Sequence, residues 1–134
     1  MKSEPPAHLK SPNRQQLQAL ITAVGGAERM HEIIFKFYVR MSNDVMIGFF
    51  FAGKNLEEVA KQQTHFILNA AGLIDRFEGK GPSTAHVALP PILRGHFDRR
   101  LVLLRETLTA AELDPLLINE WIQFEEGFRS IVVS

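Results

Sequence analysis

The five histidines are the residues of this sequence best suited to hold a metal ion, because the chain contains no cysteine. The absence of cysteine excludes disulfides, thiolate zinc sites, cysteine-held iron–sulfur clusters and a cysteine nucleophile. The sequence also lacks a phosphate-binding Walker loop, a Gly-x-Ser-x-Gly motif and a His-Glu-x-x-His motif. The neighbouring carboxylates Glu57-Glu58 and Glu125-Glu126 point in different directions on a helix, which indicates solvated faces. Any chemistry therefore depends on the histidines and the aromatic residues.

His86 differs from the other histidines because of the segment that holds it. Glycines and prolines interrupt residues 72–92 repeatedly, so at most a short helix forms there, and His86 lies close to apolar Val87 and Leu89. Such an imidazole can ligate a metal, although a histidine without a ligand role is the commoner case at such a position. Of the other four, we expect His8 to be solvated and His31 to lie on a helix surface. We expect His65 to point away from the face of Gln63, and His96 to cap a helix start or contact solvent.

Hydrophobic periodicity predicts helices along most of the chain. The segments with apolar residues at helical spacing are 13–24, 30–41, 55–70, 92–108 and 116–131. Asn13 and Asn55 are suited to cap two of these helices, and Gly25 is suited to end the first. Residues 45–51 form an apolar stretch, and we find no alternating strand pattern of useful length. The predicted fold class is all-α.

The length of the chain indicates one domain, and its net charge is not the positive charge typical of nucleic-acid-binding proteins. We expect a flexible extension over residues 1–12, which is polar and interrupted by prolines, followed by a single domain over residues 13–134. Lys+Arg and Asp+Glu both number 15, so the net charge of zero gives no electrostatic reason to expect nucleic acid or an acidic membrane surface as partner. No apolar run approaches the roughly 20 residues that span a bilayer, and no signal peptide is recognisable. We therefore expect a cytoplasmic protein.

Several pieces of the chain resemble the truncated haemoglobins, and specifically their group I. In chain order the pieces are Gly25-Gly26, Phe37-Tyr38-Val39-Arg40, the aromatic corner from Ile47 to Phe51, Gln62-Gln63-Thr64-His65-Phe66-Ile67, Phe77-Glu78-Gly79 with His86 seven residues after the glycine, and His96-Phe97-Asp98. They occur in the family's order and close to its spacing, from about Leu17 to the C-terminus.

The resemblance implies a globin-like two-on-two helical sandwich that holds haem b (iron protoporphyrin IX), with His86 as the proximal ligand of a five-coordinate iron. It implies further that the haem contacts are Phe51, Val59, Phe66, Phe77, Leu89 and Arg94. Tyr38, Gln63 and Val59 would surround the gas ligand on the opposite, distal face. A tyrosine hydroxyl and a glutamine amide can both donate a hydrogen bond to O₂.

The function implied by this resemblance is reversible binding of O₂, and of NO or CO, by an oxygen-binding protein rather than an enzyme. NO dioxygenation or redox chemistry is the further activity it suggests, with an electron donor that stays unidentified. The alternative from a different class is a cofactor-free helical-bundle interaction module in which the aromatic residues are all core.

Two positions depart from the family pattern. Gly72-Leu73 stands where the family has its second Gly-Gly pair, and Arg100 stands where the family usually has an apolar residue or tryptophan, often near the haem. Arg100 can lie there or reach outward, and Arg94 could pair with a haem propionate. We expect Phe50 and Phe97 to be core residues.

Overall fold

The computed structural model of the chain describes residues 13–74 and 91–133. Its elements in chain order are α1 (Arg14–Val24), α2 (Ala27–Ser42), the short 3₁₀ helix η2 (Gly48–Phe51), α3 (Leu56–Ala70), α5 (Arg94–Ala110), α6 (Pro115–Glu126) and α7 (Arg129–Val132). These two described segments contain no strand, which confirms the all-α prediction. No helix within them is long and apolar enough to cross a membrane.

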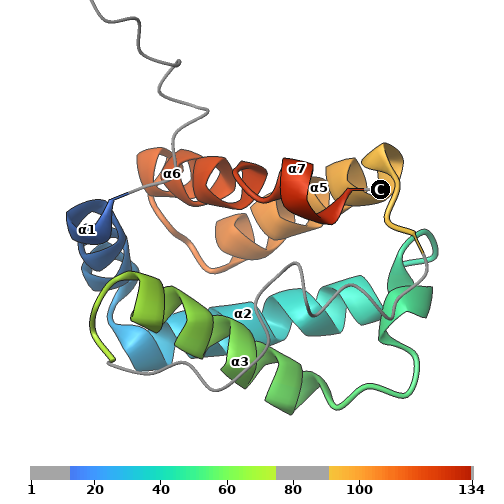
Figure 1. Cartoon of the computed structure of the whole chain (residues 1–134), viewed down its shortest axis with the longest axis horizontal. Helices are drawn as coiled ribbons and strands as arrows, with labels where there is room; N and C mark the ends of the chain where they lie inside the picture. Colours follow the sequence, from blue (N-terminus) through green and yellow to red (C-terminus); the bar gives the residue numbers. More distant parts are fainter. Residues whose placement is uncertain (1–12, 75–90, 134) are drawn as a thin grey trace, which may run out of the picture.

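The helices form two layers (Figure 1). α2 packs against α3 in one layer, and α5 packs against α6 in the other. The layers meet where α2 contacts α5, while α1 closes one end of the molecule through contacts with α2, α3 and α6. This arrangement is the two-on-two sandwich expected from the sequence.

Local sequence accounts for where the helices begin and end. Asn13 forms a capping box with Gln16, and the Asn55 side chain accepts the backbone N–H of Glu58. α1 ends at Gly25, whose φ of 117° lies in the left-handed region that favours glycine. At Gly48 a β-carbon would lie 2.6 Å from the carbonyl oxygen of Ser42, so only glycine fits this close approach.

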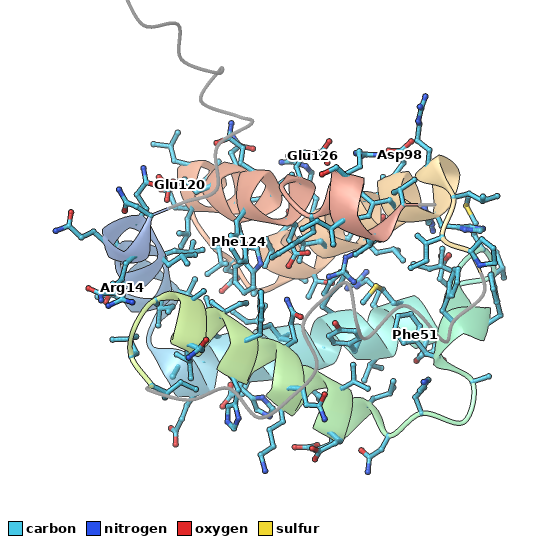
Figure 2. The ribbon with its side chains drawn as sticks, viewed as in Figure 1. Arg14, Phe51, Asp98, Glu120, Phe124 and Glu126 are labelled. Atoms are coloured by element: carbon cyan, nitrogen blue, oxygen red, sulfur yellow. The ribbon has the colours of Figure 1, made fainter. Side chains whose placement is uncertain are left out.

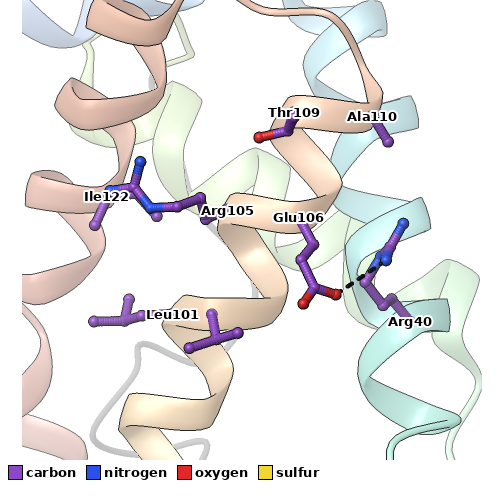
Figure 3. Close-up of a pocket in the computed structure, with 8 residues that line it drawn as sticks. Arg40, Leu101, Arg105, Glu106, Thr109, Ala110 and Ile122 are labelled. Atoms are coloured by element: carbon purple, nitrogen blue, oxygen red, sulfur yellow. Dashed lines mark hydrogen bonds and ion pairs between the residues drawn. The ribbon is translucent and has the colours of Figure 1, made fainter.

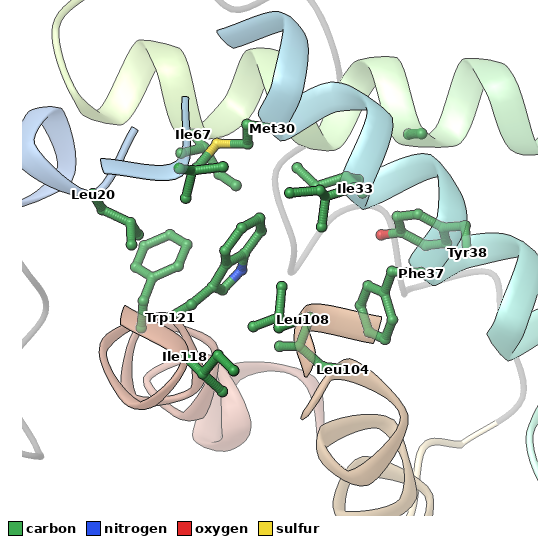
Figure 4. Close-up of a cluster of buried hydrophobic side chains, with 14 of the residues drawn as sticks. Leu20, Met30, Ile33, Phe37, Tyr38, Ile67, Leu104, Leu108, Ile118 and Trp121 are labelled. Atoms are coloured by element: carbon green, nitrogen blue, oxygen red, sulfur yellow. The ribbon is translucent and has the colours of Figure 1, made fainter. Parts of the chain in front are cut away.

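The core lies between the layers and toward α1 (Figure 4). Its largest fully buried side chains come from both layers and are Met30, Met41, Ile67, Leu104, Leu108 and Trp121. Phe124 points from α6 toward the opposite layer and is also buried (Figure 2). The expected core residues Phe50 and Phe97 are 8% and 2% exposed.

The last predicted helix differs from the structure. The sequence pattern predicts one helix over 116–131, but α6 stops at Glu126 and a separate short turn, α7, begins at Arg129. Gly127 lies at the break, where its N–H bonds to the carbonyls of Gln123 and Phe124. Periodicity continues across such a break because Phe128 still packs against Phe124, with ring centroids 5.2 Å apart.

Candidate functional site

Tyr38 lies on α2 where the two layers meet and is 6% exposed (Figure 4). Its ring contacts two other aromatic rings. Phe51 meets it edge-on at 5.6 Å between centroids, and Phe37 lies beside it at 5.7 Å. Figure 2 shows Phe51 beside α2, and its side chain is half-buried. Tyr38 therefore presents a hydroxyl group within a largely apolar and aromatic environment.

Next to Tyr38 the structure contains a buried ion pair. Arg100 on α5 donates from Nη2 to Oε2 of Glu125 on α6 at 2.9 Å, and the two side chains are only 20% and 4% exposed. Nη1 of Arg100 also lies 3.7 Å from Sδ of Met41, and its guanidinium lies over the Phe37 ring at 5.0 Å. Arg100 thus points inward, which resolves the alternatives left by the sequence.

Tyr38, Arg100 and Glu125 together form what we call the polar cluster. Tyr38 and Glu125 are buried, and the charges of Arg100 and Glu125 both act on the Tyr38 hydroxyl. Burial raises the pKa of Tyr38 above its usual value near 10; the charge of Arg100 opposes this shift and that of Glu125 adds to it. Burial alone would lower the pKa of Arg100, but Glu125 keeps it above its usual range. At neutral pH Tyr38 is a neutral hydroxyl and Arg100 is a cation.

Glu125 corrects the sequence-based interpretation of the Glu125-Glu126 pair as a solvated face. Glu126 does lie near the surface, but Glu125 is 3% exposed. Its position gave a usable indication: it follows buried Trp121 by four residues, so it lies on the apolar stripe of α6. A carboxylate on such a stripe requires a buried partner, and Arg100 is that partner.

The residues expected on α3 share one face of that helix. Val59, Gln63 and Phe66 are all half-buried, and Phe66 packs against Phe128 with centroids 5.7 Å apart. α3 runs along α2, which carries Tyr38. His65, expected to point away from Gln63, is exposed. An aromatic and aliphatic wall with one amide therefore lies in the same layer as Tyr38.

Two of the three described histidines, His31 and His96, are engaged by neighbouring groups. His31 lies 3.3 Å from the Thr64 hydroxyl through Nδ1 and 3.7 Å from Glu57 through Nε2, linking α2 to α3. Nδ1 of His96 accepts the backbone N–H of Leu93 at 3.0 Å, so of the two roles predicted for His96, helix-start cap or solvent contact, the structure shows the cap. Within the described segments no three His, Asp or Glu side chains gather as a metal site.

Three predicted site residues, Phe77, His86 and Leu89, lie outside the described residues. Arg94 is exposed at the first residue of α5. The structure thus describes the three residues predicted to surround the gas ligand (Tyr38, Val59 and Gln63) and the predicted haem contacts Phe51 and Phe66. The polar cluster adds Arg100 and Glu125 beside them.

A hollow on the outer side of α5 is a separate feature (Figure 3). It is lined by Arg40, Leu101, Val102, Arg105, Glu106, Thr109, Ala110 and Ile122. An ion pair at 3.3 Å between Arg40 and Glu106 borders it. The hollow is open to solvent and includes no residue of the polar cluster, so we do not regard it as the functional site.

Comparison with known proteins identifies the class that this fold and site define, the two-on-two truncated globins. A family model described as bacterial-like globin matches residues 19–133, and the chain belongs to that family. Family membership implies haem binding and the binding of gases such as O₂. The donor set fits such a group, because a neutral tyrosine hydroxyl and a half-buried glutamine lie within aromatic and aliphatic walls.

Individual relatives support the same class. A group 1 truncated hemoglobin from Tetrahymena thermophila is 29% identical over 106 residues, covering 79% of this chain and 87% of the relative. The crystal structure of a truncated hemoglobin from Tetrahymena pyriformis in its Fe(III) form superposes with a TM-score of 0.76 at 25% identity, covering 86% of this chain and 97% of that one. A 2/2 hemoglobin from Synechococcus sp. PCC 7002, in the cyanomet state with covalently attached heme, gives 0.69 at 25% identity, covering 84% and 94%.

Proposed function

We propose that this protein is a haem b-binding truncated globin that reversibly binds O₂, and also NO and CO, with His86 as its proximal ligand. The observation that carries the proposal is the neutral, buried hydroxyl of Tyr38 between the two layers. A haem would supply an iron with one imidazole ligand and one face open to a gas molecule. Everything else in the proposal concerns what the chain's own side chains do around that group.

The assignment of His86 is supported by the state of the other histidines. His31 and His96 are engaged by neighbouring groups, and His65 is exposed on the side of α3 away from Gln63. His8 lies in the polar N-terminal extension. His86 is the candidate left in the domain, at the spacing from Gly79 that the truncated haemoglobins show.

Tyr38 and Gln63 are proposed to donate hydrogen bonds to the gas ligand, while Phe51, Val59, Phe66, Phe77 and Leu89 contact the haem and Arg94 lies near a propionate. Solved variants of the Tetrahymena pyriformis protein change one tyrosine and two glutamines. The tyrosine and the second glutamine are separated by as many residues as Tyr38 and Gln63. By the same spacing, the first glutamine corresponds to Val59 of this chain, which is an aliphatic residue.

The first test is haem retention. Purified protein should show the absorption spectrum of a haem protein, whereas a colourless protein that ignores added haemin would favour the cofactor-free bundle. His86→Ala should lose haem during gel filtration, and His96→Ala, a matched change at a capping histidine, should keep it. Loss of haem from His96→Ala with retention by His86→Ala would reassign the proximal ligand.

The second test addresses Tyr38 directly. A hydrogen bond donated in a pocket shielded from water is worth about 1–3 kcal/mol, which corresponds to roughly a ten- to hundredfold change in ligand dissociation. Tyr38→Phe should therefore accelerate O₂ release by that factor in stopped-flow measurements. An unchanged rate would remove Tyr38 from the ligand's surroundings.

NO dioxygenation stays a prediction within this proposal. Repeated conversion of NO to nitrate requires an electron donor, which is the unidentified partner expected from the sequence. Protein equilibrated with O₂ and then mixed with NO should yield nitrate in proportion to protein if the activity is present. Nitrate no higher than in a protein-free control would restrict the protein to gas binding.

A further inference from the structure

Asp44, in the turn between α2 and η2, uses both of its carboxylate oxygens. Oδ2 accepts the backbone N–H groups of Met46 at 3.0 Å and of Ile47 at 3.2 Å, and these bonds shape the turn. Oδ1 accepts Nε and Nη2 of Arg99 on α5 at 3.1 and 2.7 Å. The Asp44 side chain is only 6% exposed. A single side chain therefore joins the turn that follows α2 to a helix of the other layer.

The aromatic corner, residues 47–51, follows this turn directly and lies between α2 and α5. Phe50 is buried and meets the ring of His96, on α5, edge-on at 5.1 Å between centroids. Phe51 meets the ring of Tyr38, on α2, edge-on at 5.6 Å. The position of Phe51 against Tyr38 thus depends on how the corner is held between the two helices.

The backbone of the corner gives it little rigidity of its own. The corner contains only one short 3₁₀ helix of four residues, and such a helix has poorer hydrogen-bond geometry than an α-helix. The contact between Asp44 and Arg99 is of a stronger kind, since two N–H groups of a cation donate to one carboxylate. The ion pair between Arg40 and Glu106 also joins α2 to α5, but it is longer, at 3.3 Å, and both its side chains are more than 40% exposed.

We propose that the Asp44–Arg99 pair governs haem retention, because it fixes the aromatic corner to α5 and so holds Phe51 in place against the haem. This inference rests on the proposed function, in which Phe51 contacts the haem. Asp44 and Arg99 are positioning residues that act through the corner. Their contact has to break before the corner can move away from α5, so its loss should make haem release faster.

Haem transfer from the Fe(III) haem-loaded protein to an excess of apomyoglobin measures that release. Arg99→Met leaves the turn bonds of Asp44 intact and should accelerate haem loss about two- to fivefold, the range expected for one partly exposed ion pair. Asp44→Asn should accelerate it at least as much, because its amide places N–H groups where Asp44 has only acceptors. The variant with both changes should lose haem more slowly than the product of the two single effects predicts.

Two further variants calibrate this assay. Asp98→Asn is the matched control, since Asp98 also lies on α5 and forms an equally short ion pair, at 2.7 Å to Arg129, away from the corner. It should release haem at the wild-type rate. Phe51→Ala removes the proposed haem contact itself and should accelerate haem loss more than Arg99→Met does.

Amide hydrogen exchange of the same proteins gives a local readout of the corner. The N–H groups of Phe50 and Ala52, which donate to the carbonyls of Ile47 and Phe49, should exchange faster in Arg99→Met, while amides in the middle of α2 and α6 stay at their wild-type rates. Arg99→Lys keeps the charge but not the paired donors, so it should lie between wild type and Arg99→Met in both measurements.

The outcomes separate this inference from the proposed function. If Phe51→Ala accelerates haem loss and Arg99→Met and Asp44→Asn do not, the retention role is wrong while the proposed function stands. If Asp98→Asn accelerates haem loss as much as Asp44→Asn, loss of any ion pair on α5 has this effect and the inference is refuted. Unchanged exchange at Phe50 and Ala52 would show that the pair does not hold the corner. If wild type takes up no haem, the proposed function fails first.

Discussion

Removal of one member of the Arg100–Glu125 pair should destabilise the protein far more than removal of both. Loss of one partner from a buried pair costs about 3–5 kcal/mol. In Arg100→Met the remaining carboxylate is 4% exposed, so the cost should lie near the upper end. In Glu125→Leu the remaining guanidinium is 20% exposed and keeps the Phe37 ring, so it can turn toward water and the cost should lie near the lower end.

The variant with both changes places apolar side chains on both sides of the contact, and its stability should be within about 1 kcal/mol of wild type. Urea unfolding followed by far-ultraviolet circular dichroism measures loss of helix in all four proteins, each compared at the same haem loading. The expected order of stability is wild type close to the double variant, then Glu125→Leu, then Arg100→Met. A double variant as unstable as the worse single variant would refute the electrostatic argument.

Three further predictions concern other parts of the molecule. Met30→Ala should lower the free energy of unfolding in urea by about 2–5 kcal/mol, because Met30 is fully buried. Met46→Ala, at a residue that is 44% exposed, should change it by no more than about 0.5 kcal/mol. Equal losses in the two variants would contradict the described core. The hydrogen bond from Arg99 lowers the pKa of Asp44, so its stabilisation is present above the normal carboxyl pKa and is lost as the pH falls through the folded value. Asp44→Asn should therefore lower the melting temperature at neutral pH and not in strong acid, and an equal loss at both would refute this assignment. The raised pKa of Tyr38 means that stability falls as the pH rises above about 10, where the unfolded chain ionises first; Tyr38→Phe should flatten that decline in urea titrations at alkaline pH, and an unchanged slope would contradict it.

Local chemistry made much of the fold predictable from the sequence. Asn13, Gly25 and Asn55 mark helix ends with side chains or backbone angles that act within a few residues. The break at Gly127 was not predictable from periodicity, because Phe128 continues the apolar pattern of α6 after the helix itself has stopped. Helix ends that depend on local hydrogen bonds can therefore be predicted from the sequence, whereas a helix break that preserves the side-chain packing cannot.

The site shows the same division. Tyr38 and the α3 residues follow from motifs within single helices, and their burial agrees with the pattern. The partnership of Arg100 with Glu125 joins residues on two different helices, and it depends on how α5 packs against α6. Sequence spacing alone did not decide whether Arg100 points inward or outward, and it predicted a solvent-exposed position for Glu125.

The packing of α2 has a consequence for the order of folding. Most contacts between elements join neighbours along the chain, since α2 packs on α1, η2 and α3, and α5 packs on α6. Such local topology favours rapid collapse of the described segments 13–74 and 91–133 as two separate helical halves. The halves then dock mainly through α2 with α5 and α1 with α6. Arg100 on α5 meets Met41 and the Phe37 ring of α2 across that docking plane, so we expect these contacts to form among the last, with φ-values near zero for Arg100.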